Sequence, residues 1–558
     1  MLTLMYHQYS ARICACPSST STRRTQTSCS RATSSSPLTE GHWRSRRRIY
    51  TTTMGFGSSF LFVPPRPLFS HLCLFQGEQQ TNGWSRGHGV ILDASYGVAA
   101  SVEPGGSGGM AADMHVLKMI DGGESGIIST YGPRRWDLTP WGLDAGVGWI
   151  LESGFQEIDV MTGALLFEWA SLDHVPPEEG LVAPSSSRES GSGTGLSSDD
   201  PWDYFHLNSV DKTSGGDYVV SASHTSTIYR VDGKTGEVVW RVEGVGSGGG
   251  GYANLDGLDF SFQQDVRILH EADDETTLSI FDNAADQPGE NGAGARHTSG
   301  KIIQLNHTDR TVRLLRSYPS PRRKLSSSQG GGMQLLDPGG VSASLDAGLS
   351  LSGNAILCWG DTGSFTEVDT ETGEVALDAG FDDRLDTMLY RVYKSNWTAR
   401  PLTLPALWTY SLDGPETDNS STTGYVSWNG ATEVRRWKLH GSAQGGNGPW
   451  IVVDEVSKQG FETAFRVDMY YGWTYAEALD EEGKLLGSSK VTETFVPGDA
   501  LRMNNACDEN GCRGIESSGA TKDDGLIRAW GSDTSFGLVM LALFCASLFV
   551  AWSAWRRK

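Results

Sequence analysis

Six polar residues fall on segments that the sequence predicts to be the inner strands of a repeated β unit. They are His115, His206, Asn208, Gln264, Gln334 and Arg391. His206 and Asn208 are two residues apart on one predicted strand, so both side chains leave the same face. A buried histidine can act as a nucleophile or proton shuttle near neutral pH. An asparagine amide or a second histidine can stabilise developing oxyanion charge, so this group predicts a catalytic centre if the fold brings it together.

The elements that must position these residues are short antiparallel strands. Within residues 203–242 four of them are expected, separated by turns rich in Gly, Asp and Ser. They are Tyr204–Val210, Asp217–Ser223, Ser226–Asp232 and Glu237–Val242. Four such strands in about 40 residues are the repeat of a β-propeller. The pattern recurs from Met114 to Tyr470, with the sixth unit over 425–470. We therefore predict an all-β, six-bladed β-propeller whose inner strands line a central channel.

Three further residues are predicted to have structural roles. His224 lies at the tip between two predicted strands and is expected to be solvated. His174 is expected to be a structural loop residue, and Asn283 is expected to lie in a turn. A lone strand histidine is itself more often structural than catalytic, so the prediction of chemistry depends on clustering.

Composition excludes several classes of function. The chain has 558 residues and a formal net charge of −22, which argues against a nucleic-acid partner. Its eight cysteines show no zinc-ligand spacing, so neither a metal site nor a cofactor is predicted. Cys507 and Cys512 are close enough in sequence to form a small-loop disulfide in an oxidising compartment.

The chain divides into five predicted regions. Residues 1–85 are expected to be disordered, a targeting region or the product of a mistaken translation start. Residues 86–485 form the propeller and 486–534 a polar tether. Residues 535–555 carry no charge and are long enough for a single membrane-spanning helix. The basic residues 556–558 are expected to be cytoplasmic, which places the body outside the cell or in a secretory lumen.

Three glycosylation sequons agree with that placement. They begin at Asn306, Asn396 and Asn419. The sequence thus predicts a single-pass membrane glycoprotein of the secretory pathway or cell surface.

Several motifs, in order, carry a resemblance to a known family. FHLNSVDKTSGGDYVVSASHTSTIYRVDGKTGEVVWRVEG, FSFQQDVRIL, GNAILCWGDTGSFTEVD and YVSWNGATEVRRW resemble the arylsulfotransferase (ASST) family, in its eukaryotic, largely fungal branch. The resemblance runs from about Gly87 to about Leu479. It implies a six-bladed propeller that transfers a sulfuryl group from a phenolic sulfate ester to a phenol, without a nucleotide donor. In the bacterial enzymes a histidine is transiently sulfated, while other His, Asn and Arg residues hold the sulfate.

By motif, His206 and Asn208 match the family's sulfate-binding pair, and His115 matches another channel histidine. Two positions depart from the pattern. Ser223 stands where the family has arginine, and Gln264 stands where it has the probable nucleophilic histidine. Glutamine cannot form the covalent intermediate, because an amide is not a useful nucleophile.

Two hypotheses remain open at this point. In the first, the chain is a membrane-tethered sulfotransferase-like enzyme for aryl sulfates and phenols, and His206 or His115 replaces the lost nucleophile. In the second, it is a non-catalytic propeller that binds a ligand or a protein partner. The sequence does not identify this protein partner.

Overall fold

The computed structural model describes residues 71–498, with short gaps, and four strands outside that range. The gaps are 107–108, 144–147, 186–191, 246–250, 286–296, 323–326, 337–341, 345–347, 382–387 and 417–419. The outlying strands are β1 (Arg47–Thr53), β2 (Phe60–Val63), β34 (Cys507–Asp508) and β35 (Gly511–Cys512). The described residues form strands, turns and 3-10 turns, and nearly all strand pairs are antiparallel. The prediction of an all-β fold is confirmed.

Three sheets repeat one order, in which four antiparallel strands lie side by side in the order in which they occur along the chain. The first contains β10 (Leu207–Lys212), β11 (Tyr218–Ala222), β12 (Thr227–Val231) and β13 (Val238–Glu243). The second contains β15 (Gln264–Glu271), β16 (Glu275–Asp282), β17 (Ser299–Asn306) and β18 (Thr311–Pro319), with β14 (Ala253–Asn254) parallel to β18. The third contains β19 (Gly332–Leu335), β22 (Asn354–Cys358), β23 (Ser364–Asp369) and β24 (Val375–Gly380). Beside it lies the hairpin of β20 (Ser342–Ser344) and β21 (Gly348–Ser350).

One turn sequence closes the outer hairpin of three units. Its aspartate accepts hydrogen bonds from the backbone N–H and the hydroxyl of the threonine three residues later; these pairs are Asp159–Thr162, Asp232–Thr235 and Asp369–Thr372. The following glycines have φ of 70°, 77° and 73°, a left-handed conformation that glycine adopts without steric cost. The turn therefore fixes the register of each outer strand pair.

The N-terminal sheet is larger than the repeat. It contains β2, β3 (His71–Gln79), β4 (Ser85–Leu92), β5 (Val98–Val102), β6 (Ala111–Ile120), β7 (Ser125–Trp136), β8 (Gly148–Asp159) and β9 (Leu165–Ala170). Strand β3 pairs with β4 from Leu72 to Gln79, so this sheet includes residues before position 86. Strand β1 pairs with β25 (Leu389–Asn396).

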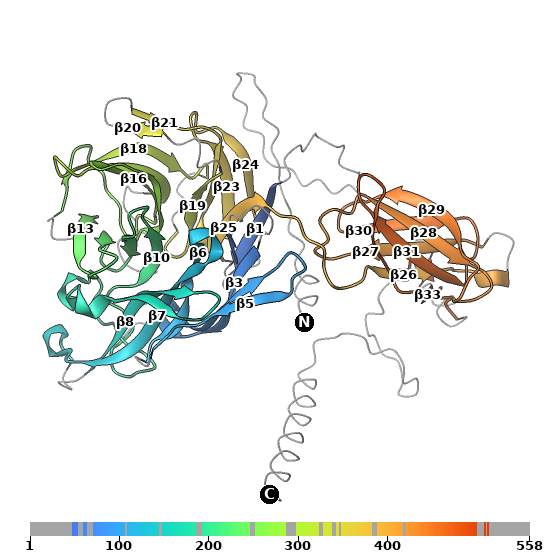
Figure 1. The fold of residues 1–558 in the computed structure, drawn as a ribbon, viewed down its shortest axis with the longest axis horizontal. Helices are drawn as coiled ribbons and strands as arrows, with labels where there is room; N and C mark the ends of the chain where they lie inside the picture. Colours follow the sequence, from blue (N-terminus) through green and yellow to red (C-terminus); the bar gives the residue numbers. More distant parts are fainter. Residues whose placement is uncertain are drawn as a thin grey trace, which may run out of the picture.

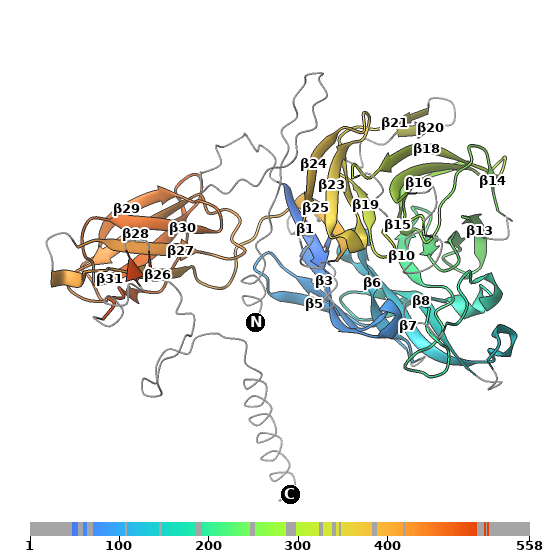
Figure 2. The ribbon, with the colours of Figure 1, turned by 180° about the vertical axis from the view of Figure 1, so that it is seen from behind.

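These sheets surround a common centre (Figure 1). Strands β6, β10 and β19 lie toward its middle, and the reverse view adds β15 (Figure 2). Strand β10 contacts both β6 and β15, while β19 contacts β25. The arrangement thus brings inner strands that are far apart in sequence next to one another.

The segment after β25 forms a separate body, which lies to one side of the ring in both views. One of its sheets contains β26 (Ala406–Tyr410), β27 (Thr422–Ser427) and β30 (Glu462–Val467). The other contains β28 (Arg436–Ser442), β29 (Ile451–Ser457), β31 (Trp473–Leu479), β32 (Leu485–Ser488) and β33 (Thr492–Glu493). Val426, Trp437 and Phe465 pack in one core between the two sheets. The prediction that 425–470 is a sixth blade is wrong, because its strands are divided between the two sheets of a sandwich.

Short 3-10 helices connect some of the strands. They are η2 (Thr81–Gly83), η3 (Asp121–Gly123), η4 (Thr139–Trp141), η5 (Ser171–Asp173), η6 (Pro177–Glu179), η9 (Gly360–Thr362) and η11 (Gly414–Glu416). No helix among the described residues is long and apolar enough to span a membrane.

Several sequence predictions fall outside the described residues. These are the membrane-spanning segment 535–555, the basic tail 556–558, most of the tether, and Asn419. The backbone register places Cys507 opposite Cys512 in the β34–β35 pair, and their disulfide stays a prediction. Asn306 ends β17 and Asn396 ends β25, and their glycosylation likewise stays a prediction.

Two valines test the assignment of the core. Val219 on β11 is 1% exposed, whereas Val239 on β13 is 48% exposed. Val219→Ala should lower the free energy of unfolding by about 2 kcal/mol, because two buried methyl groups are lost. Val239→Ala should change it by less than about 0.5 kcal/mol. Urea denaturation followed by tryptophan fluorescence measures both values, and equal losses would contradict the assigned faces.

Candidate functional site

Three histidines lie together at the centre of the ring. The ring centroids of His115 and His206 are 4.8 Å apart, and those of His206 and His224 are 4.6 Å apart. His115 belongs to β6, His206 immediately precedes β10, and His224 lies in the turn between β11 and β12. We call these three residues the histidine cluster. The ring fold therefore brings together imidazoles that are up to 109 residues apart in the sequence.

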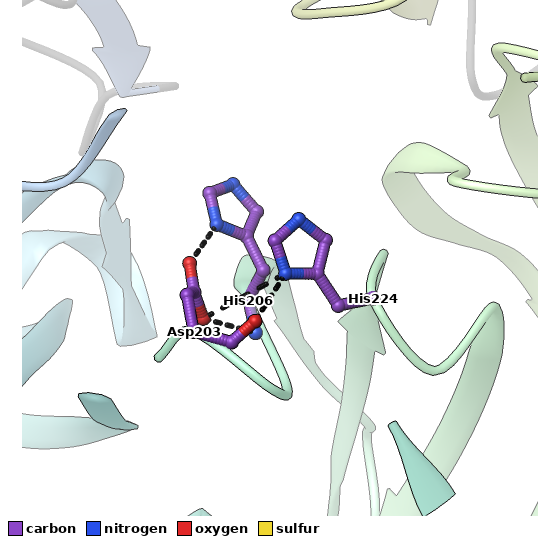
Figure 3. Close-up of side chains that lie close together, drawn as sticks. All are labelled: Asp203, His206 and His224. Carbon is purple, nitrogen blue, oxygen red and sulfur yellow. Dashed lines mark hydrogen bonds and ion pairs between the residues drawn. The ribbon is translucent and has the colours of Figure 1, made fainter. Parts of the chain in front are cut away.

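Asp203 orients His206. Its Oδ2 lies 2.6 Å from Nδ1 of His206, and its Oδ1 accepts from the His206 backbone N–H at 3.1 Å (Figure 3). Because an ionised carboxylate only accepts hydrogen bonds, Nδ1 carries the proton. The backbone of His206 has a φ of 54°, which is uncommon outside glycine. This conformation is fixed by buried Tyr204 and Phe205, which anchor the turn in the core.

Asp203 also orients His224. Nδ1 of His224 donates to the backbone carbonyl of Asp203 at 2.6 Å and lies 3.9 Å from its Oδ1. His224 is 5% exposed, so the prediction that it is solvated is wrong. Its turn folds inward because the N–H groups of Ser223 and His224 donate to the carbonyls of His206 and Phe205, each at 3.1 Å.

Asp113 orients His115 in a similar way. Its Oδ1 accepts from Nδ1 of His115 at 2.6 Å, and its Oδ2 accepts from the backbone N–H of Ser85 at 2.7 Å. Ser129 donates a third hydrogen bond to the same carboxylate, at 3.1 Å. Asp113 is fully buried, so His115 is held by a carboxylate that cannot easily move.

The environments of the histidines shift their pKa values in opposite directions. Burial lowers the pKa of His115 below its ordinary value despite the neighbouring Asp113. Burial also lowers the pKa of His224, to about 4. Burial opposes protonation of His206 as well, but the charge and hydrogen bond of Asp203 outweigh it and raise the pKa. Neutral His115 and protonatable His206 can therefore act as base or nucleophile and as acid.

Arg391 and Asn208 join the cluster, as predicted from the sequence. Arg391 on β25 donates to the carbonyl of Asn208 at 2.7 Å and to that of His115 at 3.3 Å. It also lies 3.6 Å from Asp265. The amide of Asn208 donates to the carbonyl of Gln263 at 2.8 Å and to Ser223 at 3.2 Å. Asn208 Oδ1 is buried and has no partner among the described residues.

The two predicted glutamines have different surroundings. Gln264 begins β15, is 6% exposed, and its Oε1 has no partner among the described residues. Gln334 instead exchanges two hydrogen bonds with the backbone of Lys394, at 2.8 and 3.2 Å. These bonds tie β19 to β25, and Gln334 makes no hydrogen bond to the histidine cluster.

Aromatic rings lie against the cluster. The Tyr131 ring stacks at 5.6 Å from the ring of His115, and the Tyr390 ring meets it edge-on at 5.7 Å. Tyr131 donates its hydroxyl to the carbonyl of Leu207 at 2.6 Å. The hydroxyl of Tyr390 is buried and has no partner among the described residues. The site thus combines imidazoles with apolar ring faces.

Sequence reasoning missed Asp113, Asp203 and His224. Asp113 precedes His115 by two residues, and Asp203 precedes His206 by three. An aspartate shortly before each candidate histidine was the available signal for both carboxylates. His174 stacks on Trp169 at 5.4 Å, in agreement with a structural role, and Asn283 donates to the carbonyls of Ser327 and Gly330.

Asp203→Asn tests the electrostatics of the site. Loss of the carboxylate should lower the pKa of His206, because burial then acts without the compensating charge. Histidine Cε1–H resonances followed over pH report this midpoint, which should lie above the ordinary value in the wild type and below it in the variant. Asp232→Asn, in an exposed turn, is the control. A His206 midpoint that stays in place would show that Asp203 does not set its charge.

This chain is similar to several solved structures and to one protein family. Among solved structures, a GH43 protein from Bacillus licheniformis has 9% identity and a TM-score of 0.28, with 80% of this chain and 91% of that chain covered. Virginiamycin B lyase from Staphylococcus aureus has 10% identity and a TM-score of 0.25, with 59% and 73% covered. A search of curated proteins gives no match. The arylsulfotransferase (ASST) family model matches residues 68–382, which is more than half of the 558 residues. The chain therefore belongs to the arylsulfotransferase (ASST) family.

Proposed function

We propose that this protein transfers a sulfuryl group from a phenolic sulfate ester to a phenol, without a nucleotide donor, at the histidine cluster. Membership of the family supports aryl sulfates and phenols as the substrate class. One observation carries the site assignment: two aspartate-held histidines lie 4.8 Å apart and have pKa values shifted in opposite directions. That combination supplies a neutral nucleophile beside an acid, in a chain that has Gln264 where the resemblance implies the family's usual histidine.

In the first half-reaction, His115 acts as the nucleophile. Its Nδ1–H is held by Asp113, which leaves the Nε2 lone pair to attack the sulfur. The nitrogen–sulfur bond forms as the bond between sulfur and the phenolic oxygen breaks. His206 donates its proton to the departing oxygen, so the phenol leaves neutral. The Asp113 carboxylate stabilises the positive charge on the sulfated imidazole.

In the second half-reaction, the acceptor phenol gives its proton to His206. The phenolic oxygen then attacks the sulfur, the nitrogen–sulfur bond breaks, and His115 returns to its neutral form. His206 ends the cycle protonated, as it began. The rings of Tyr131 and Tyr390 are buried against His115 and shield its imidazole from water.

A second candidate function is ligand binding without catalysis. Ser223 and Gln264 remove a guanidinium and an imidazole that the family uses for sulfate. Asn208 Oδ1 and Gln264 Oε1 are both buried acceptors without partners among the described residues. A sulfate group offers only acceptor oxygens, which cannot donate a hydrogen bond to Asn208 Oδ1 or Gln264 Oε1. These two atoms therefore favour a ligand that carries hydrogen-bond donors.

Transfer assays decide between the two candidates. With an aryl sulfate donor and a phenol acceptor, His115→Ala and His206→Ala should each lower kcat/KM by about 10²- to 10⁴-fold, the usual range for a positioned acid, base or nucleophile. His440→Ala is the matched control, because His440 lies on β28 in the separate sandwich. Wild-type transfer no faster than that of His115→Ala would remove the enzyme hypothesis.

We propose further that the body faces the lumen or exterior and is held by residues 535–555, with 556–558 in the cytoplasm. The uncharged composition of that segment and its basic end support this placement. Full-length protein should stay in the membrane after carbonate extraction, whereas a chain ending at residue 534 should be released. A glycosidase-sensitive mass that falls in Asn306→Gln, Asn396→Gln and Asn419→Gln would report the lumenal side. Release of the full-length chain by carbonate would contradict the anchor.

A further inference from the structure

We propose that the histidine cluster binds a divalent late transition-metal ion, such as Zn²⁺, through the Nε2 atoms of His206 and His224, with His115 as the adjacent third imidazole. This inference does not rest on sulfuryl transfer; it gives a ligand class to the second candidate function. It also implies that an ion would inhibit transfer, because it would hold the nitrogen atoms that the reaction needs.

The first observation is the way in which the rings are held. Each of the three Nδ1 atoms lies 2.6 Å from an aspartate oxygen: a carboxylate oxygen of Asp113, a carboxylate oxygen of Asp203 and the carbonyl oxygen of Asp203. Metal-binding histidines nearly always donate their second N–H to a carboxylate or a backbone carbonyl, which fixes the tautomer and the ring orientation. The cluster therefore already has the outer hydrogen bonds of a metal centre.

The second observation is the state of the Nε2 atoms. Because Nδ1 is the donor in each ring, Nε2 of the neutral imidazole is left with its lone pair. None of the three Nε2 atoms makes a hydrogen bond within the described part of the chain. Figure 3 shows Nε2 of His206 and Nε2 of His224 on the same side, away from Asp203. Imidazole nitrogen is a preferred ligand for Zn²⁺, Cu²⁺ and Ni²⁺.

The third observation is how close the possible ligand atoms lie to one another. Asp203, His206 and His224 each place a ligating atom within 4.8 Å of the others, and they are the one such group of three among the described residues, so His206 and His224 are the principal ligands and His115 lies outside the group. The rings of His206 and His224 are 24° from parallel. Because both rings are held at Nδ1, an ion shared by their Nε2 atoms requires one of these hydrogen bonds to lengthen as its ring tilts toward the other.

The fourth observation is the local charge. Asp113, Asp203 and Asp265 are buried and contribute −3, and Arg267 and Arg391 contribute +2, so these five side chains sum to −1, which a proton on His206 balances and a bound cation would balance in its place. Arg391 already donates to two backbone carbonyls and Arg267 is paired with Asp265 at 2.6 Å. A cation is therefore favoured at this centre over a second negative group.

Binding by the full-length, chelator-treated protein tests the proposal. Titration with Zn²⁺ in the absence of any sulfate ester should give one ion per chain. His206→Gln and His224→Gln should each weaken binding by tenfold or more, and Asp203→Asn by 10- to 100-fold. His440→Gln, on β28, should match the wild type. Unchanged affinity in the His206→Gln/His224→Gln double variant, or no binding by the wild type, would overturn the proposal.

A measurement on the wild type covers the case in which a variant does not fold. X-ray absorption of the Zn²⁺-loaded protein should show two or three imidazole nitrogens at about 2.0–2.1 Å. A shell made only of oxygen would overturn the assignment. Transfer assays run in chelator report the proposed reaction separately, so failure of one proposal can be distinguished from failure of the other.

Discussion

The site depends on one buried aspartate that holds two histidines. The carboxylate of Asp203 accepts from Nδ1 of His206, and its backbone carbonyl accepts from Nδ1 of His224. Asp203 has no exposed surface, so these hydrogen bonds are not weakened by competing water. They fix both tautomers, and the carboxylate raises the pKa of His206. Removing this carboxylate would change the tautomer and the pKa of His206, while the backbone carbonyl that holds His224 would remain.

The ring of sheets places the Asp203–His206 turn beside other inner strands. Strands β6 and β10 are in contact, which places His115 beside His206. Arg391 on β25 then donates to the carbonyls of Asn208 and His115, and so connects three inner strands through their backbones. A guanidinium used in this way is a fixed structural element.

The sequence predicted the members of the site that lie on inner strands. His115, Asn208 and Arg391 follow from strand phase, because alternate residues leave the same face. His224 was misplaced because its turn curves inward through hydrogen bonds to Phe205 and His206, which no local pattern reveals. The prediction of a sixth blade was wrong for a related reason. Alternating apolar residues indicate a strand but not its partner, and the strands of 425–470 pair in a sandwich.

The two candidate functions share one set of atoms, and they differ in what those atoms do. An imidazole with its Nδ1–H on a carboxylate is a good nucleophile and also a good metal ligand. In the proposed transfer, His115 is the residue on which catalysis would depend, because Gln264 stands where the family resemblance implies a histidine. Mass spectrometry of peptides from protein mixed with an aryl sulfate donor, without acceptor, tests this directly. One sulfuryl group is expected on His115; its absence there, or its presence on another residue, would show that His115 is not the nucleophile.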